Sequence, residues 1–214
     1  MARMTAANLL DGVSPRHLRM PYVEKGMQVG LFGGSFNPPH QGHLLVCEIA
    51  LRTLGLDQLW WLVTPGNPLK VGREIAPLAE RLALSETISS DPRIKVTALE
   101  AAHAVRYTAD TLALIRQHNP GVDFVWIMGA DNLADFHRWQ RWRDIAKTMP
   151  IAVIDRPGST LSFLSSVMAR TFAHARIDER EARMLSRMRP PAWTFIHGPR
   201  SSLSSTAIRA AQRH

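Results

Sequence analysis

The sequence contains one cysteine, Cys47, in 214 residues, and it has no long uninterrupted hydrophobic run. A single thiol cannot form an intramolecular disulfide, so the cysteine count gives no sign of an oxidising compartment, and we expect a cytoplasmic protein. A membrane-spanning helix needs about 18 consecutive apolar residues, and no stretch approaches that length. These absences argue against a disulfide-rich secreted domain and against a membrane partner.

The first 26 residues lack the sustained apolar core and the cleavage site of a secretory signal. Their arginines resemble those of an organellar transit peptide, but Asp11 and Glu24 argue against that reading. We expect residues 1–26 to form a loosely ordered N-terminal extension. No repeat and no linker divides the rest, so residues 27–214 are expected to form a single domain.

Acidic residues are scarce relative to basic ones, with 18 Asp and Glu against 26 Lys and Arg. The resulting net charge of +8 fits an anionic partner, which could be nucleic acid or a phosphorylated small molecule. Many arginines lie between residues 170 and 200 without interleaved aromatic residues, which is also typical of a solvated basic face. Charge alone does not choose among these interpretations.

Short apolar runs alternate with segments of helical periodicity along the chain. This βαβ rhythm, with runs that are hydrophobic throughout, predicts an α/β fold: a Rossmann-like, doubly wound, mostly parallel sheet with helices on both faces. The predicted strands lie at residues 27–32, 59–64, 94–99, 123–129, 150–155 and 193–197. The predicted helices lie at residues 43–55, 78–88, 108–118 and 142–147, with a basic helical stretch after residue 160 and a terminal helix from Ser204.

Motifs rich in polar residues, glycine and proline follow the strands: GGSFNPPH, TPGNPLK, MGADN and DRPG. In a parallel sheet the ligand binds outside the carboxyl ends of the strands, near the switch in strand order. We therefore expect these motifs to meet at one edge of the sheet.

The motif after the first strand is suited to anions. Gly33 and Gly34 let the backbone approach a ligand closely and expose its N–H groups, and Ser35 adds a hydroxyl donor. The helix that begins near Gln41 directs unpaired N–H groups and the positive end of its dipole toward the same place.

His40 and His43 are three residues apart at the start of that helix, which places both rings on one side with about 5 to 6 Å between their Cβ atoms. We interpret them as donors to a bound polyphosphate; a purely structural role and half of a metal site are the alternatives. The motif also matches neither GxGxxG nor GxxxxGK[ST].

The stretch GGSFNPPHQGH resembles the signature of nucleotidyltransferases that carry an HxGH motif, and SSTAIR near the C-terminus resembles the second motif of that family. MGADNLADFHRW, YTADTL and DRPG resemble, more narrowly, the bacterial nicotinate mononucleotide adenylyltransferases. The likeness spans about residues 28 to 212. It implies that residues 27–214 are a nucleotidyltransferase domain that joins nicotinate mononucleotide to the adenylyl group of ATP and releases pyrophosphate.

The resemblance implies a role for each basic residue. His40, His43 and Arg209 would be catalytic through contacts with the ATP phosphates, and Mg²⁺ would arrive with ATP as the cofactor. The implied ATP-binding residues are Gly33, Gly34, Ser35, Phe36, His40, His43, Gly129, Asp131, Ser205, Thr206 and Arg209. Asp131 would accept from the ribose hydroxyls or would cap a helix instead, and Ser205 and Thr206 also look like an ordinary N-cap.

The implied mononucleotide-binding residues are Gly34, Ser35, Lys70, Thr108, Asp110 and Trp139. Lys70 is carried over with a departure, because Leu69 stands where the family often has histidine. Trp139 has the position of the aromatic ring that stacks on the pyridine, although Trp142 could be the packed ring or Trp139 could belong to the core. Thr108 could equally be a helix N-cap.

Other functions remain open at this point. Related enzymes with the HxGH motif use nicotinamide mononucleotide or phosphopantetheine as acceptor, or transfer a cytidylyl group to an alcohol phosphate. A basic nucleic-acid-binding protein and a catalytically silent nucleotide sensor are further alternatives. The sequence does not show whether the chain forms a homo-oligomer.

Overall fold

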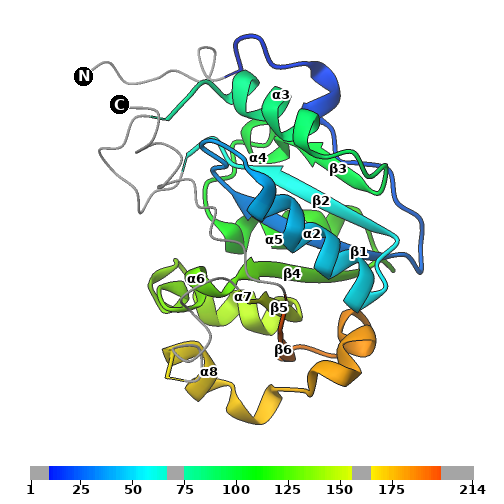
Figure 1. Cartoon of the computed structure of the whole chain (residues 1–214), viewed down its shortest axis with the longest axis vertical. Coiled ribbons are helices and arrows are strands. Elements are labelled where there is room, and N and C mark those ends of the chain that lie inside the picture. The colour runs from blue at the N-terminus through cyan, green and yellow to red at the C-terminus, as the bar shows by residue number, and fades with distance from the viewer. Residues whose placement is uncertain (1–9, 67–74, 156–164, 199–214) are drawn as a thin grey trace.

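The computed structural model describes residues 10–66, 75–155 and 165–198, which contain one parallel sheet of six strands (Figure 1). The strand order is β3-β2-β1-β4-β5-β6. The strands are Gln28–Gly34 (β1), Gln58–Val63 (β2), Ile94–Thr97 (β3), Asp123–Gly129 (β4), Ile151–Ile154 (β5) and Trp193–Ile196 (β6). The chain moves outward from β1 to β3 and then returns to place β4 beside β1, which is the doubly wound Rossmann-like order, so the predicted fold class is confirmed.

Helices cover both faces of this sheet. The α-helices are α2 (Gln41–Leu54), α3 (Leu78–Ile88), α4 (Leu99–Ala102), α5 (Thr108–His118), α6 (Ala130–Leu133), α7 (Trp142–Thr148) and α8 (Val167–Thr171). The 3-10 helices are η1 (Pro15–Leu18), η2 (Phe136–Arg138), η3 (Ala173–Ala175) and η4 (Glu179–Arg187). Apolar residues of α2, α3 and η4 belong to one core cluster, and those of α5 and α7 belong to another.

The strands contribute to both clusters because successive side chains point to opposite faces. Trp60 packs in the cluster with α5, whereas Trp61 packs in the cluster with α2, and both are fully buried. This two-sided burial explains why the strands are hydrophobic throughout. Cys47, on α2, is buried in the cluster that contains residues of α2, α3 and η4, as its place among apolar residues indicated.

The basic stretch expected to be helical forms only short helices where the structure describes it. Its helical segments are α8, η3 and η4, and η4 has 3-10 geometry over nine residues. Ala182 and Leu185 of η4 are buried, while Arg180, Arg183 and Arg187 are exposed. Those three arginines are therefore solvent-exposed, and Arg180 and Arg187 form ion pairs with Asp178 and Asp123.

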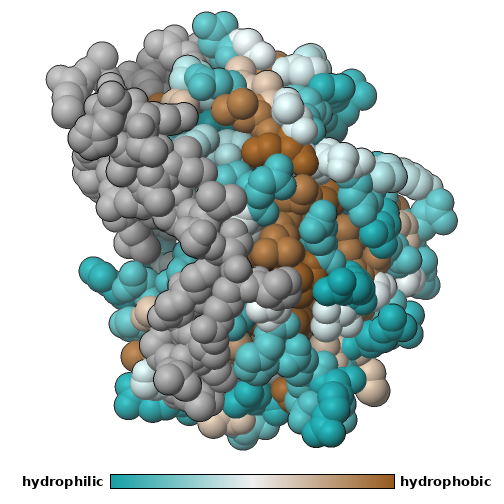
Figure 2. Space-filling model, in the orientation of Figure 1, coloured by the Kyte–Doolittle hydropathy of each residue, from teal (hydrophilic) through white to brown (hydrophobic). Residues whose placement is uncertain are grey.

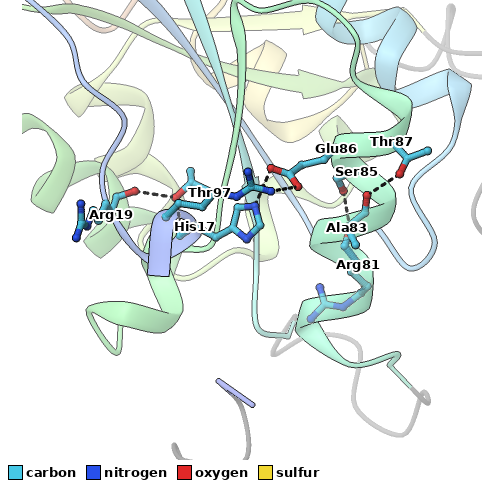
Figure 3. A network of polar contacts seen from close by, with 9 residues as sticks. His17, Arg19, Arg81, Ala83, Ser85, Glu86, Thr87 and Thr97 are labelled. Atoms are coloured by element: carbon cyan, nitrogen blue, oxygen red, sulfur yellow. Dashed lines mark hydrogen bonds and ion pairs between the residues drawn. The ribbon is translucent and has the colours of Figure 1, made fainter. Parts of the chain in front are cut away.

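The N-terminal segment, described from residue 10, docks against β3 and α3 (Figure 3). The His17 side chain is 6% exposed, and its Nε2 lies 2.8 Å from Oε1 of Glu86 on α3. The carbonyl oxygen of His17 accepts from the backbone N–H of Ala98 at 2.7 Å and from Oγ1 of Thr97 at 2.9 Å. No local pattern in the sequence indicates a partner for His17, because Glu86 is 69 residues away.

The surface seen in Figure 2 carries a band of hydrophobic residues over the area where α2 lies, bordered by hydrophilic residues. Leu44 and Leu45 of α2 are only partly buried and pack against the core cluster that contains residues of α2, α3 and η4. No helix in the described part of the chain is long and apolar enough to cross a membrane.

One carboxyl group is buried beside the sheet. Glu100, on α4, is 7% exposed and accepts a hydrogen bond from Oγ1 of Thr111 on α5 at 2.8 Å. Burial raises the pKa of Glu100 to about 7, because desolvation of the charged form outweighs the opposing hydrogen bond from Thr111. Near neutral pH this carboxyl group therefore takes up a proton.

The buried carboxyl group makes stability depend on pH. Between the usual pKa of 4.5 and the folded value of about 7, the folded state holds a proton that the unfolded state has lost. The free energy of unfolding therefore falls as pH rises through this window and levels off above it. We expect Glu100→Gln to gain stability over the wild type across the window, on the order of 3 kcal/mol in total.

Urea unfolding at pH 5, 6, 7 and 8 measures this difference. Glu181→Gln, which changes an exposed carboxyl group on η4, is the matched control and should alter the pH dependence far less. A constant difference between Glu100→Gln and the wild type at all four pH values would contradict the prediction.

Candidate functional site

The described parts of the motifs that follow the strands lie at one edge of the sheet, and residues 67–70 of TPGNPLK and 156–158 of DRPG are outside the described residues. The parallel register pairs Gly34 at the end of β1 with Val63 of β2, and Gly129 at the end of β4 with Ile154 of β5. The strand order reverses between β1 and β4, which are neighbours. The carboxyl ends of β1 and β4 therefore border the crevice in which open α/β sheets bind their ligands.

The two glycines that end β1 leave room for aromatic rings. A Cβ atom on Gly33 would lie 2.6 Å from Cη2 of Trp126 on β4, and one on Gly34 would lie 3.1 Å from the ring of Phe36. The first distance is shorter than side-chain contacts allow, so Gly33 is required for Trp126 to pack here. The glycines thus permit close packing, and they lie within β1, paired with Leu62 and Val63 of β2, rather than after the strand.

His40 and His43 cap the N-terminus of α2 together. Nδ1 of His40 accepts from the backbone N–H of Gly42 at 3.1 Å, and Nδ1 of His43 accepts from the backbone N–H of His40 at 3.2 Å. The two rings lie nearly face to face, with 3.8 Å between their centroids and 32° between their planes. Both rings are buried and lie on one side of the helix start, as their spacing predicts.

These hydrogen bonds assign the tautomer of both rings. A neutral imidazole has one N–H and one acceptor nitrogen, and in each ring Nδ1 is the acceptor. Nε2 of His40 and of His43 therefore carries the hydrogen. Each ring satisfies a backbone donor of the helix and still has a donor of its own.

Phe36 packs beneath His43. Its ring meets His43 edge to face at 4.9 Å between centroids and also contacts Trp61 at 4.9 Å. The backbone of Phe36 has φ of 44°, an uncommon value for a non-glycine residue. The resemblance implied an ATP contact for Phe36. The structure shows in addition that the Phe36 ring packs against the His43 ring.

Arg81 of α3 is a residue that the sequence reasoning missed. It is 1% exposed, and its Nη1 donates to the carbonyl oxygens of Ser35 at 2.6 Å and Thr64 at 2.8 Å. Its Nε donates to the carbonyl of Ala76 at 3.0 Å and its Nη2 to that of Pro65 at 3.3 Å. Burial lowers the pKa of Arg81 to about 10, so the guanidinium stays charged at neutral pH.

The two candidate stacking tryptophans differ in their surroundings. Trp142 is 7% exposed and lies between Phe136 and Phe172 in the core. Trp139 is half-buried, and its ring contacts Trp126 at 6.4 Å between centroids. Trp126 in turn packs on Gly33, so one ring, that of Trp126, lies between Trp139 and the end of β1. This geometry favours Trp139 as the ring available to a ligand.

Thr108 and Asp110 lie in the first turn of α5. The N-cap position belongs to Tyr107 without a side-chain cap, so Thr108 is the first helical residue and does not cap this helix. The Asp110 carboxylate is half-exposed and pairs with Arg141 at 2.5 Å. Arg141 has φ of 54° and follows Trp139 by two residues, so the ion pair connects α5 to the segment that carries Trp139.

Gly129 ends β4 and occupies the N-cap position of α6. Asp131 is exposed in the first turn of that helix, where it is not the capping residue. Lys70, Ser205, Thr206 and Arg209 lie outside the described residues. Within the described ranges, no group of three or more His, Cys, Asp or Glu side chains could hold a metal ion.

Comparison with known proteins agrees with this geometry. The model of the cytidylyltransferase-like family matches residues 31–211. A protein of Mesorhizobium japonicum named probable nicotinate-nucleotide adenylyltransferase is 77% identical over 190 residues, which cover 89% of this chain and 97% of that protein. A protein of Brucella abortus with the same name is 75% identical over 186 residues, which cover 87% of this chain and 96% of that protein.

A solved structure shares the fold. The nicotinic acid mononucleotide adenylyltransferase of Plasmodium falciparum, complexed with APC, superposes with a TM-score of 0.63 at 18% identity, over 86% of this chain and 83% of that one. The resemblance carried by the motifs is therefore confirmed across most of the sequence. The chain belongs to the cytidylyltransferase-like family and, within it, to the nicotinate-nucleotide adenylyltransferases.

Proposed function

We propose that the chain transfers the adenylyl group of ATP to nicotinate mononucleotide, giving nicotinic acid adenine dinucleotide and pyrophosphate in the cytoplasm. This reaction is a step of NAD biosynthesis. The observation that carries the proposal is the pair of adjacent histidine rings at the start of α2, whose Nδ1 atoms accept from the helix backbone so that Nε2 carries the hydrogen in each ring. The names of relatives at 75% identity and above support the same reaction.

The chemistry requires positioning and charge stabilisation. A phosphate oxygen of the mononucleotide forms a bond to the α-phosphorus of ATP, while the bond from that phosphorus to the pyrophosphate oxygen breaks. The attacking group is already an anion, so no protein nucleophile is needed. His43 donates through Nε2–H to the phosphate oxygens that gain negative charge, and His40 donates beside it.

The remaining ATP-binding roles follow from position. Gly33, Gly34 and Ser35 provide backbone close to the phosphates, and Asp131 accepts from the ribose hydroxyls. Ser205, Thr206 and Arg209 bind the β- and γ-phosphates, with Arg209 suited to bidentate contacts. Mg²⁺ would arrive bound to ATP and would supply positive charge to the phosphate oxygens.

In this proposal the mononucleotide and the ATP phosphates lie on opposite sides of Gly33 and Gly34. Trp139 stacks on the pyridine ring, since it is half-buried next to Trp126 rather than enclosed in the core. Thr108 and Asp110 approach the same substrate from the start of α5, and Lys70 supplies a cation to its phosphate. Asp110 also keeps its ion pair with Arg141, which fixes the segment that carries Trp139.

Pyrophosphate release tests the function directly. Mg·ATP is offered with nicotinate mononucleotide, nicotinamide mononucleotide or phosphopantetheine in separate reactions. We expect release mainly with the nicotinate form. Faster release with nicotinamide mononucleotide would contradict only the proposed preference for nicotinate mononucleotide. No release with any acceptor would contradict the proposed enzymatic activity itself. Retention on DNA that falls with salt and ignores ATP would favour a nucleic-acid-binding protein instead.

Replacing His43 with Ala should lower kcat by about 10² to 10³-fold, because one donor to the developing charge is lost. The measurement is steady-state pyrophosphate release with both substrates saturating. His118→Ala, which changes an exposed histidine on α5, is the matched control and should leave kcat near the wild-type value. A folded His43→Ala variant with full activity would show that the assignment is wrong.

Replacing Trp139 with Ala should raise KM for nicotinate mononucleotide by about 10 to 100-fold, the range expected when stacking on one ring is lost. KM for ATP should change little, because the adenine lies elsewhere. Trp139→Phe keeps a stacking surface and should recover most of the affinity. Equal effects of Trp139→Ala on both substrates would indicate a general packing role for this residue.

A further inference from the structure

Arg81 is an unusual residue for its position on the fold. It is the fourth residue of α3 (Figure 3), close to the helix N-terminus, where the helix dipole disfavours a cation. Its side chain is also buried away from water. No carboxylate pairs with it in the described part of the chain. A methionine or leucine would fill this buried place without the desolvation penalty that a charge brings.

What Arg81 provides is a connection between three segments of backbone. Its guanidinium donates to Ser35 after β1, to Thr64 and Pro65 after β2, and to Ala76 before α3. Only a planar fork with five N–H donors can serve that many carbonyl oxygens at once, and an ammonium group cannot reproduce its geometry. The three segments that it joins approach the candidate site from separate elements.

The bond to Ser35 also determines how the next residue is oriented. The peptide between Ser35 and Phe36 is trans, because the cis bonds in the described chain lie elsewhere. In a trans peptide the C=O and the following N–H point in opposite directions. When Arg81 binds the Ser35 carbonyl, the N–H of Phe36 points away from the guanidinium. The hydrogen bond thereby fixes the orientation of the peptide plane between Ser35 and Phe36.

Phe36 transmits this constraint to the histidine pair. Its φ of 44° is an uncommon conformation that needs support from its surroundings. Its ring contacts His43 edge to face at 4.9 Å, and His43 lies against His40 at 3.8 Å between centroids. A second cross-link lies nearby, since Asn37 Oδ1 accepts from the N–H of Ala76 at 3.2 Å.

We propose that Arg81 is a positioning residue of the adenylyl-transfer site, which sets the place of the His43 ring by holding the Ser35 carbonyl and, through it, Phe36. This inference rests on the proposed function for its catalytic consequence. Its structural part, the path from Arg81 through Phe36 to His43, does not depend on the reaction.

The test compares Arg81→Lys, which keeps the positive charge, with Arg81→Met, which removes it. We expect both to lower kcat far more than they raise either KM, by roughly 10²-fold, the loss that follows a displacement of about 1 Å. Thr194→Val is the matched control. It removes a buried hydroxyl donor on β6, which binds the carbonyl of Ile177 at 3.1 Å, and it should lower stability without a comparable loss of kcat.

A second measurement follows His43 in the absence of substrates. The ring current of Phe36, whose centroid lies 4.9 Å from that of His43, should shift the NMR signal of the His43 Cε1–H, and His43→Ala assigns that signal. In folded Arg81→Lys the signal should move, whereas in Thr194→Val it should stay. Circular dichroism and thermal unfolding establish that each variant is folded at the temperature of measurement, and Arg81→Met gives the same readout should the lysine variant not fold.

The outcomes separate the two proposals. A folded Arg81 variant with kcat within twofold of the wild type, or with an unmoved His43 signal, would overturn the positioning role. Wild-type protein without adenylyl transfer would overturn the proposed function alone, and a moved His43 signal would then still support the path through Phe36.

Discussion

The candidate site depends on the use of imidazole rings, rather than hydroxyl or carboxylate groups, to cap α2. Serine or aspartate would satisfy the helix N–H groups equally well, but aspartate would place a negative charge where an anion is to bind. His40 and His43 accept from the backbone through Nδ1 and keep Nε2–H as a donor. The same two side chains therefore cap the helix through Nδ1 and, in the proposed function, would donate to a phosphate through Nε2.

Most of the fold could be predicted because its signals are local. Strands buried on two sides need consecutive apolar residues, and the helices between them show a 3.6-residue period, so both kinds of element were visible in the sequence. The pair Trp60 and Trp61 follows from the same rule, since neighbouring strand residues face opposite cores. The short helices between residues 165 and 190 were less predictable, because that stretch alternates charged and small residues without a sustained period.

The site could be predicted where its residues lie close together in sequence and could not where they meet over long distances. The spacing of His40 and His43 was sufficient to place their rings together. Arg81 is 46 residues from Ser35, and a lone arginine in a helix carries no sign that it will be buried on backbone carbonyls. Arg141 likewise reaches Asp110 across 31 residues, so the ion pair that fixes the Trp139 segment had no local pattern.

Two of the buried ionisable groups, Glu100 and Arg81, respond differently to the loss of water. Glu100 can become neutral, since its pKa rises to about 7, and it then needs few partners. Arg81 keeps its charge, because even a pKa lowered to about 10 leaves it protonated, and it must be satisfied by carbonyl oxygens. A positive charge therefore remains next to the loop after β1, where the phosphates are proposed to bind. The negative charge of Glu100, beside α5, is reduced near neutral pH because this group is partly protonated. In the proposed function a bound anion would lie near this charge, and attraction between the two would offset part of the desolvation of Arg81.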